Sequence, residues 1–134
     1  MVPLTKEAKN FANLLGVRIG GVNHNLSRED LMKRIANCDM TLYTTYSECA
    51  PMTSLESFAQ GTLCIVGNNC HYFKNEELED YIVVSEENNP EAIANKMIYA
   101  FKNKEKILKL YKAWEKKNKE LSNKQLNDFL KDGE

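Results

Sequence analysis

The chain has 134 residues, the usual length of a single domain with its own hydrophobic core. Hydrophobic residues make up 43% and charged residues 28%, which is ordinary for a globular protein rather than a disordered chain. The net charge of -1 gives no global field that would favour nucleic acid as a partner. We find no signal peptide and no apolar run of about 18 residues, so we expect no integral membrane segment.

Charge is distributed unevenly along the chain. From Lys102 to Lys131 ten lysines stand against four acidic residues, whereas the preceding part is acidic. We interpret the basic end as a solvated helix face, with weak contact to an acidic surface as the alternative.

The four cysteines do not suggest a metal site or disulfides. None of their spacings is CxxC, and only Cys70 has a histidine beside it, so we expect no zinc. Cys38 and Cys64 lie in or beside apolar runs, where cysteine behaves as a small buried hydrophobe. Reduced thiols favour a cytoplasmic location. Peripheral contact with the inner face of the membrane is compatible with that location.

Apolar periodicity and turn residues predict the elements in the first half of the chain. Thr5 can cap the first helix and Gly16 can end it. Ser27 followed by Asp30 is a carboxylate version of the capping box. The expected elements are a helix over Thr5–Gly16, a strand over Val17–Gly21, a polar loop over Asn23–Asn25, a helix opened by Ser27 and a strand over Cys38–Thr45.

The second half contains the clearest strand signal. Leu63–Gly67 is a continuous apolar run, which is typical of a strand buried on both faces. Pro90 suits the first turn of a helix. The expected elements are a helix over Thr53–Gln60 ended by Gly61, the strand Leu63–Gly67, a strand over Tyr81–Val84, a helix from Pro90, and a helical region from Lys104 to Leu130 with a break at Ser122 and Asn123.

Alternating helices and short strands predict an α/β fold, a three-layer Rossmann-like parallel sheet with helices on both faces. We expect one domain over residues 1–134, in which 104–134 are C-terminal helices with an exposed apolar stripe. Tyr111 and Trp114 are expected to pack in the core or against another domain. In such sheets ligands bind outside the carboxyl ends of the strands. Any site should therefore lie in the loops after Gly21, Thr45 and Gly67.

The loop after Thr45 carries the most informative pattern. Glu48 lies in the loop, and Glu56 follows in the first turns of the next helix. A helix N-terminus attracts phosphate, and flanking carboxylates can accept hydrogen bonds from sugar or ribose hydroxyls. The alternative is structural, because Thr53 to Glu56 also matches a capping box that would only close the helix start.

This stretch resembles the signature of the retaining glycosyltransferases of family 4 and their GT-B relatives. Glu48 and Glu56 match a Glu-x7-Glu pair, Ser57–Gly61 matches the helix end, and Leu63–Val66 matches the next strand. The segment Asn88–Ala94 resembles a later helix opening of the family. The likeness covers roughly residues 7 to 105 and suggests the C-terminal, donor-binding domain of such an enzyme.

The resemblance implies retaining transfer of a sugar from a nucleotide-diphosphate-sugar donor to a glycan, lipid or other acceptor, without a cofactor or required metal. Glu48 would be the catalytic residue facing the transferred sugar, and Glu56 would bind the ribose hydroxyls. The remaining donor contacts would be backbone amides around Cys49, Ala50, Met52 and Thr53 for the diphosphate, and Asn23 and His24 near the base.

Some features depart from the family pattern. The family commonly has Gly-Phe-Gly where this chain has Cys49, Ala50 and Pro51, and a proline offers no N–H to a phosphate. The family's preceding strand with a basic pair, and its N-terminal acceptor domain, have no counterpart here. We therefore expect a missing partner domain or chain, and a chain that is inactive alone. The competing hypothesis is a non-catalytic interaction or scaffold domain derived from a glycosyltransferase.

Two histidines lie in candidate ligand loops. His24 and His71 could each touch a ligand, but we favour a solvent-exposed or structural role for both. Cys49 has no neighbouring histidine to activate it, so thiol catalysis is not expected.

Overall fold

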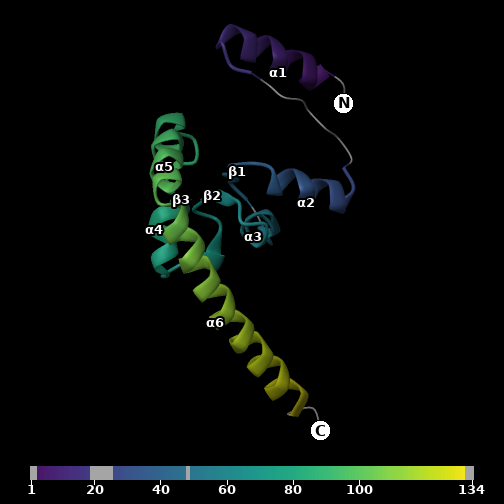
Figure 1. The fold of residues 1–134 in the computed structure, drawn as a ribbon, viewed down its shortest axis with the longest axis vertical. Helices are drawn as coiled ribbons and strands as arrows, with labels where there is room; N and C mark the ends of the chain where they lie inside the picture. Colours follow the sequence, from purple (N-terminus) through teal and green to yellow (C-terminus); the bar gives the residue numbers. More distant parts are fainter. Residues whose placement is uncertain (1–2, 19–25, 48, 132–134) are drawn as a thin grey trace. The chain divides into compact units, whose positions relative to one another are not determined.

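The computed structural model describes residues 3–18, 26–47 and 49–131 (Figure 1). Contacts divide the chain into two compact units, Met1–Leu31 and Met32–Glu134. The second unit contains the sheet, the main core and the described part of the candidate site.

The first unit contains helix α1 (Pro3–Leu14). Gly16 follows it with φ 66°, Val17 N–H donates to the Ala12 carbonyl at 2.8 Å, and Gly16 N–H donates to Asn13 at 3.2 Å. This is a Schellman motif, and it confirms Gly16 as the helix stop. Thr5 lies inside the helix, so its prediction as the cap is wrong, because a proline is tolerated in the first turn and the helix begins earlier.

The first two residues of the strand predicted at Val17–Gly21 are described, and they do not form a strand. Val17 and Arg18 belong to no strand, and the rest of that segment, with the predicted loop Asn23–Asn25, lies outside the described residues. Helix α2 (Arg28–Ala36) follows as expected. Ser27 Oγ accepts the Asp30 N–H at 3.1 Å and donates to Asp30 Oδ2 at 2.7 Å, which confirms the predicted cap.

Three parallel strands form one sheet in the order β1 (Met40–Tyr43), β2 (Leu63–Gly67) and β3 (Val83–Val84). Met40 pairs with Leu63, and Val66 pairs with Val83. Every residue of the central strand β2 is buried, as its apolar run predicted. The α/β fold class is confirmed, although the described residues contain three strands rather than four.

Helices lie on both sides of this sheet. Figure 1 shows α3 (Met52–Ala59) on the opposite side of the strands from α4 (Glu77–Ile82) and α5 (Pro90–Lys102). Gly61, with φ 75°, follows the end of α3 as predicted. Asn89 Oδ1 accepts the N–H groups of Glu91 and Ala92 at 3.0 and 3.2 Å, and so caps α5 in front of Pro90.

The segment before β3 differs from the prediction. Tyr81 and Ile82 belong to α4, so the strand predicted over Tyr81–Val84 is only two residues long. Leu78 and Ile82 are four residues apart and both buried, which is helical rather than strand spacing. A short apolar run does not distinguish these two states without knowledge of its neighbours.

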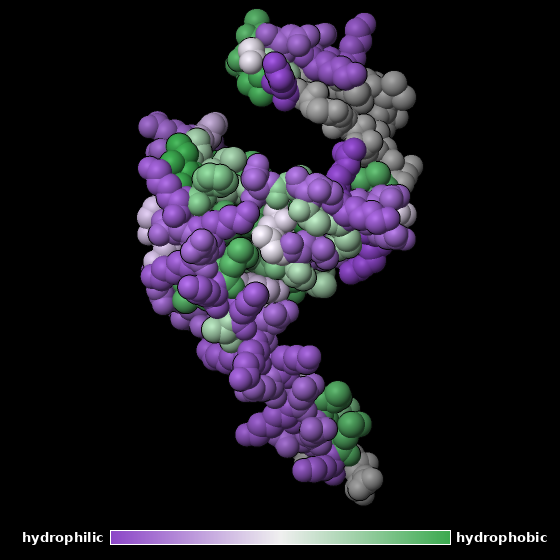
Figure 2. Space-filling view, in the orientation of Figure 1, coloured by the Kyte–Doolittle hydropathy of each residue, from purple (hydrophilic) through white to green (hydrophobic). Residues whose placement is uncertain are grey.

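The C-terminal helix α6 (Lys104–Lys131) is continuous, so the predicted break at Ser122 and Asn123 is wrong. Both residues cost less than about 1 kcal/mol in a helix, too little to interrupt this one. All described residues after Asn118 are exposed, and Figure 2 shows an apolar patch near the end of α6. This confirms the predicted exposed stripe, which consists of Leu121, Leu126, Phe129 and Leu130.

Aromatic rings join α3 and α6 to the segment after β2. The Phe58 ring stacks on Tyr111 with centroids 4.7 Å apart and meets the edge of Phe73 at 5.8 Å. Trp114 lies 5.0 Å from Phe73, so Tyr111 and Trp114 pack in the core as predicted. Such pairs contribute about 0.5–1.5 kcal/mol each beyond their burial, and they hold α3 firmly in place.

Cys38 and Cys64 were both expected to be buried, but only one of them is. Cys64, on β2, is fully buried, whereas Cys38 is exposed and its predicted burial is wrong. Cys38 N–H donates to the Ile35 carbonyl in the turn after α2, ahead of β1, so it precedes the buried part of the chain.

Candidate functional site

The carboxyl ends of the three strands define the candidate site. Because the strands are parallel, the loops after β1, β2 and β3 leave the same edge of the sheet. These loops begin at Thr44, Asn68 and Ser85. The site residues predicted between Cys49 and Thr53 lie in the first loop and the opening turn of α3.

The opening turn of α3 is closed by hydrogen bonds within the chain. Pro51 is the N-cap, with φ -73° and ψ 61°, and its ring is buried. Met52 N–H donates to the Ala50 carbonyl at 2.7 Å, and Ser54 N–H donates to Pro51 at 3.2 Å. Ser54 Oγ donates to the same Pro51 carbonyl at 2.7 Å. An anion at this helix start would have to displace the Met52 bond or use the remaining amides.

The start of α3 shows whether Glu56 has only a capping role. The helix begins at Met52 with Pro51 as its cap and no side-chain cap bond, so Thr53 lies inside the helix. The capping box predicted over Thr53 to Glu56 is therefore wrong, because a capping Thr would have to precede the first turn. Glu56 does not close the helix start.

Glu56 lies one turn further along α3 and is half-buried. It lines an open groove of about 360 Å³ between α3 and α6, together with Trp114 and Lys119. Cys49, Ala50 and Met52 are exposed, and Thr53 is half-buried. The structure thus brings together Cys49, Ala50, Met52 and Thr53, with Glu56 one turn beyond, whereas Glu48, Asn23 and His24 lie outside the described residues.

Three residues at this edge, Asn69, Glu87 and Gly67, were not predicted from the sequence. Asn69 Nδ2 donates to the Thr45 carbonyl at 3.0 Å and also to the Tyr46 carbonyl. Glu87 Oε1, from the loop after β3, accepts the Asn68 N–H at 2.6 Å. Gly67 lies between the Glu87 side chain and the Thr45 carbonyl. A Cβ at position 67 would stand 2.8 Å from Glu87 Cγ and 3.2 Å from the Thr45 oxygen. The only sequence signal was the glycine that ends the buried strand.

The two buried thiols, Cys64 and Cys70, are not activated. Cys70 is buried beside Ser54, with Oγ and Sγ 3.8 Å apart, and burial raises the pKa of its thiol. Burial also raises the pKa of Cys64 to about 11. Both therefore stay protonated near pH 7 and are poor nucleophiles. His71 is exposed and lies against the Tyr72 ring, 4.9 Å between centroids.

Two further structural findings concern metals and membranes. Across the described ranges, no three His, Cys, Asp or Glu side chains gather in a group that could hold a metal ion. None of the helices in those ranges combines the length and apolar character needed to span a bilayer.

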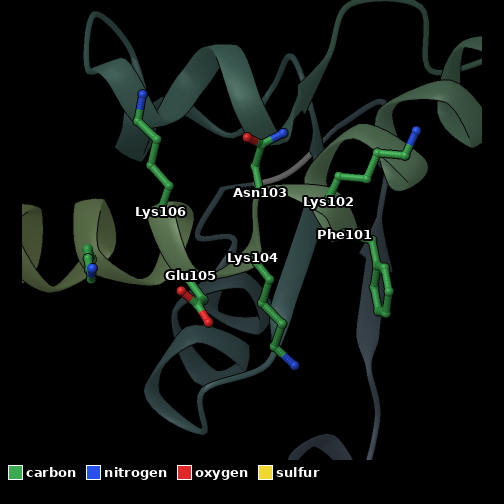
Figure 3. A pocket seen from close by; sticks show the side chains of 7 residues that line it. Phe101, Lys102, Asn103, Lys104, Glu105 and Lys106 are labelled. Carbon is green, nitrogen blue, oxygen red and sulfur yellow. The ribbon is translucent and has the colours of Figure 1, made fainter.

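A hollow of about 610 Å³ at the α5–α6 junction lies away from this edge (Figure 3). Phe101 and Lys102 also line a second hollow with Asp39 and Met40, which places them at the amino end of β1. Figure 3 shows the Lys102, Lys104 and Lys106 side chains pointing in different directions, so they do not converge on one anion. Lys106 forms an ion pair with Glu77 at 2.8 Å. We therefore place the candidate site at the carboxyl edge.

Comparison with known proteins identifies the family. The family model of the glycosyl transferases group 1 matches residues 6–121, which is most of the chain. Comparisons with curated proteins and with solved structures find no match. The match includes the parallel sheet, the α3 start and the groove residues up to Lys119. The chain therefore belongs to the group 1 glycosyltransferases.

Proposed function

We propose that the chain is the nucleotide-diphosphate-sugar-binding part of a retaining glycosyltransferase, acting on a glycan, lipid or other acceptor in polysaccharide assembly. The observation that carries the proposal is the family match together with the position of Cys49–Thr53 at the carboxyl edge of a parallel sheet. This is where open α/β sheets bind nucleotides, and a helix N-terminus there favours a diphosphate.

The proposed roles follow the residues at this edge. Glu48 would face the transferred sugar, and Glu56 would accept hydrogen bonds from the ribose hydroxyls. Amides around Cys49, Ala50, Met52 and Thr53 would contact the diphosphate, and Asn23 and His24 would lie near the base. The reaction would need no metal and no cofactor, and it would take place on the cytoplasmic side of the cell.

We also propose that transfer requires a second domain or chain that holds the acceptor and supplies cations to the diphosphate. Charged hydrogen bonds contribute about 1.5–3 kcal/mol each, so without such cations the donor should bind weakly. Sugar transfer or donor hydrolysis by the isolated chain would contradict this part of the proposal.

The alternative is a scaffold domain that has lost catalysis. Two observations favour it: Pro51 has no N–H, and the Met52 amide already donates to Ala50 at 2.7 Å. Both reduce the number of amides available to an anion at the α3 start. A folded chain that binds no nucleotide sugar would support this alternative.

The decisive experiment combines a protein variant with a ligand variant. The melting temperature of the wild type should rise with one of the uridine, guanosine or adenosine diphosphate sugars. Glu56→Gln should weaken that binding about tenfold, because a charged hydrogen bond contributes about 1.5–3 kcal/mol and the neutral one that the amide can still accept contributes about 0.5–1.5 kcal/mol. Glu105→Gln, an exposed change on α6 at the opposite edge, should bind like the wild type.

The ligand variant tests the ribose contact itself. Replacing ribose by 2′,3′-dideoxyribose should weaken binding to the wild type more than binding to Glu56→Gln, because the amide keeps only one uncharged acceptor oxygen for the ribose hydroxyls. If Glu56→Gln binds the normal donor as tightly as the wild type, Glu56 does not hold the ribose.

A further inference from the structure

The loops after β1, β2 and β3 are fastened to one another at the carboxyl edge. The Asn69 side chain reaches from the second loop to the first, where it donates to the Thr45 and Tyr46 carbonyls. The Glu87 carboxylate reaches from the third loop to the second and accepts the Asn68 N–H at 2.6 Å. We call Asn69, Asn68 and Glu87, with Gly67 between the loops, the rim clasp.

Asn69 connects positions that are far apart along the chain, 24 and 23 residues respectively. A primary amide has two N–H donors, and Asn69 directs Nδ2 at two successive carbonyls. Fixing both carbonyls orients the peptide that leads directly into the Ser47–Ala50 segment. An exposed loop without such bonds would have to be ordered by the ligand, at a cost in conformational entropy.

Gly67 allows the loops to come this close. A Cβ at this position would stand 2.8 Å from Glu87 Cγ and 3.2 Å from the Thr45 oxygen, so the first and third loops both contact the glycine. The end of β2 is itself fixed, because the strand is buried throughout and paired with a neighbour on each side. The clasp therefore ties the first loop to the central, fully buried strand of the sheet.

We propose that Asn69 is a positioning residue for donor binding, which holds the loop after β1 so that Cys49, Ala50 and the α3 start meet the diphosphate. This inference rests on the proposed function. It assigns Asn69 no contact with the donor. Its contribution lies in ordering the loop before the donor arrives, which lowers the entropic cost of binding.

Three variants test this role. Asn69→Asp keeps the shape of the side chain but removes both donors and places a carboxylate opposite two carbonyls. Asn69→Gln restores the amide on a longer stem. Asn127→Asp is the matched control, because it adds the same charge on the exposed end of α6, where the Asn127 side chain makes no hydrogen bond to another described residue.

The measurements are hydrogen–deuterium exchange of residues 44–50 without ligand, and affinity for uridine, guanosine and adenosine diphosphate. We expect Asn69→Asp to speed exchange in this loop and to weaken binding about tenfold, which corresponds to about 1.4 kcal/mol. Asn69→Gln should recover part of both effects, and Asn127→Asp should resemble the wild type. Unchanged Trp114 fluorescence in every variant would show that the core remains intact.

The two readouts separate failure of the clasp from failure of the proposed function. Unchanged exchange in Asn69→Asp would overturn the clasp, and faster exchange with unchanged affinity would overturn the positioning role. If the wild type binds none of the three nucleotides, the proposed function fails and the positioning role fails with it. The exchange data would then still show whether Asn69 orders the loop.

Discussion

Replacing Gly67 by alanine tests the closest approach in the rim clasp. The added methyl would stand 2.8 Å from Glu87 Cγ, 3.0 Å from Glu87 Oε1 and 3.2 Å from the Thr45 oxygen. Carbon atoms do not approach within 3.0 Å without displacement, so the Glu87 side chain must move. That movement breaks its 2.6 Å hydrogen bond with the Asn68 N–H.

The expected cost combines three contributions. Overpacking costs about 1–3 kcal/mol, and loss of the Glu87 hydrogen bond costs about 0.5–1.5 kcal/mol. The backbone opposes this, because Gly67 has no positive φ and alanine there gains about 0.5–1 kcal/mol over glycine. These contributions span about 0.5–4 kcal/mol, and we expect Gly67→Ala to lower the free energy of unfolding by about 2 kcal/mol.

A double-mutant cycle with Glu87→Ala tests whether the methyl group at position 67 meets the Glu87 side chain. Glu87→Ala alone should cost about 1 kcal/mol, because it removes only the hydrogen bond. In the double variant the clash with Glu87 is gone and the hydrogen bond is lost only once, so its cost should fall short of the sum by about 1.5 kcal/mol or more. Gly61→Ala is the control, since φ 75° makes alanine unfavourable there, by about 1–2 kcal/mol, but no atom lies within 4 Å of its Cβ.

The assay is urea unfolding followed by the fluorescence of Trp114, the single tryptophan. Its ring lies 5.0 Å from Phe73 and 5.6 Å from Tyr111, so its emission reports on the core of the unit that contains the clasp. Additivity of Gly67→Ala and Glu87→Ala within about 0.5 kcal/mol would refute the reasoning, because it would mean that the two side chains do not meet.

Other predictions follow from capping and from the cysteines. Asn89→Ala should lower the free energy of unfolding by about 1 kcal/mol, since it leaves two N–H groups at the start of α5 without their cap, and urea unfolding will measure this. In the native chain a thiol reagent should modify the exposed Cys38 and Cys49 rapidly, and the buried Cys64 and Cys70 only after denaturation. Rapid modification of all four at neutral pH would contradict the burial of Cys64 and Cys70. The pKa of Cys64 is raised from 9.0 to about 11, so above pH 9 the unfolded chain loses this proton first and stability should fall between pH 9 and 11. Cys64→Ala should flatten that fall, as measured by unfolding at a series of pH values.

Features with local causes were predictable from the sequence alone. The run Leu63–Gly67 was expected to be a strand buried on both faces, and it is the central strand of the sheet. Gly16 and Gly61 were expected to end helices, and both follow helix ends with positive φ. Ser27 caps α2 through Asp30 as expected. In each case the relevant residues lie within a few positions of one another, so the pattern contains the whole interaction.

The candidate site was only partly predictable. The loop after β1 and the α3 start lie at the expected edge, because strand direction fixes that edge once the sheet is parallel. The structural alternative for Glu56 was decided only by where α3 begins, and that depends on the buried Pro51 cap. The positions of Glu48, Asn23 and His24 relative to Glu56 remain predictions, since these three lie outside the described residues.

The sequence by itself thus determined the α/β class, the buried central strand and the helix stops at Gly16 and Gly61, because these depend on short-range patterns. Only the tertiary structure decided that Tyr81 and Ile82 join a helix, that Cys38 is exposed and that Asn69 and Glu87 fasten three loops at Gly67. Each of these depends on partners supplied by other elements. The Asn69 side chain donates to carbonyls 24 and 23 residues earlier in the chain, and a local sequence pattern cannot predict contacts over that separation.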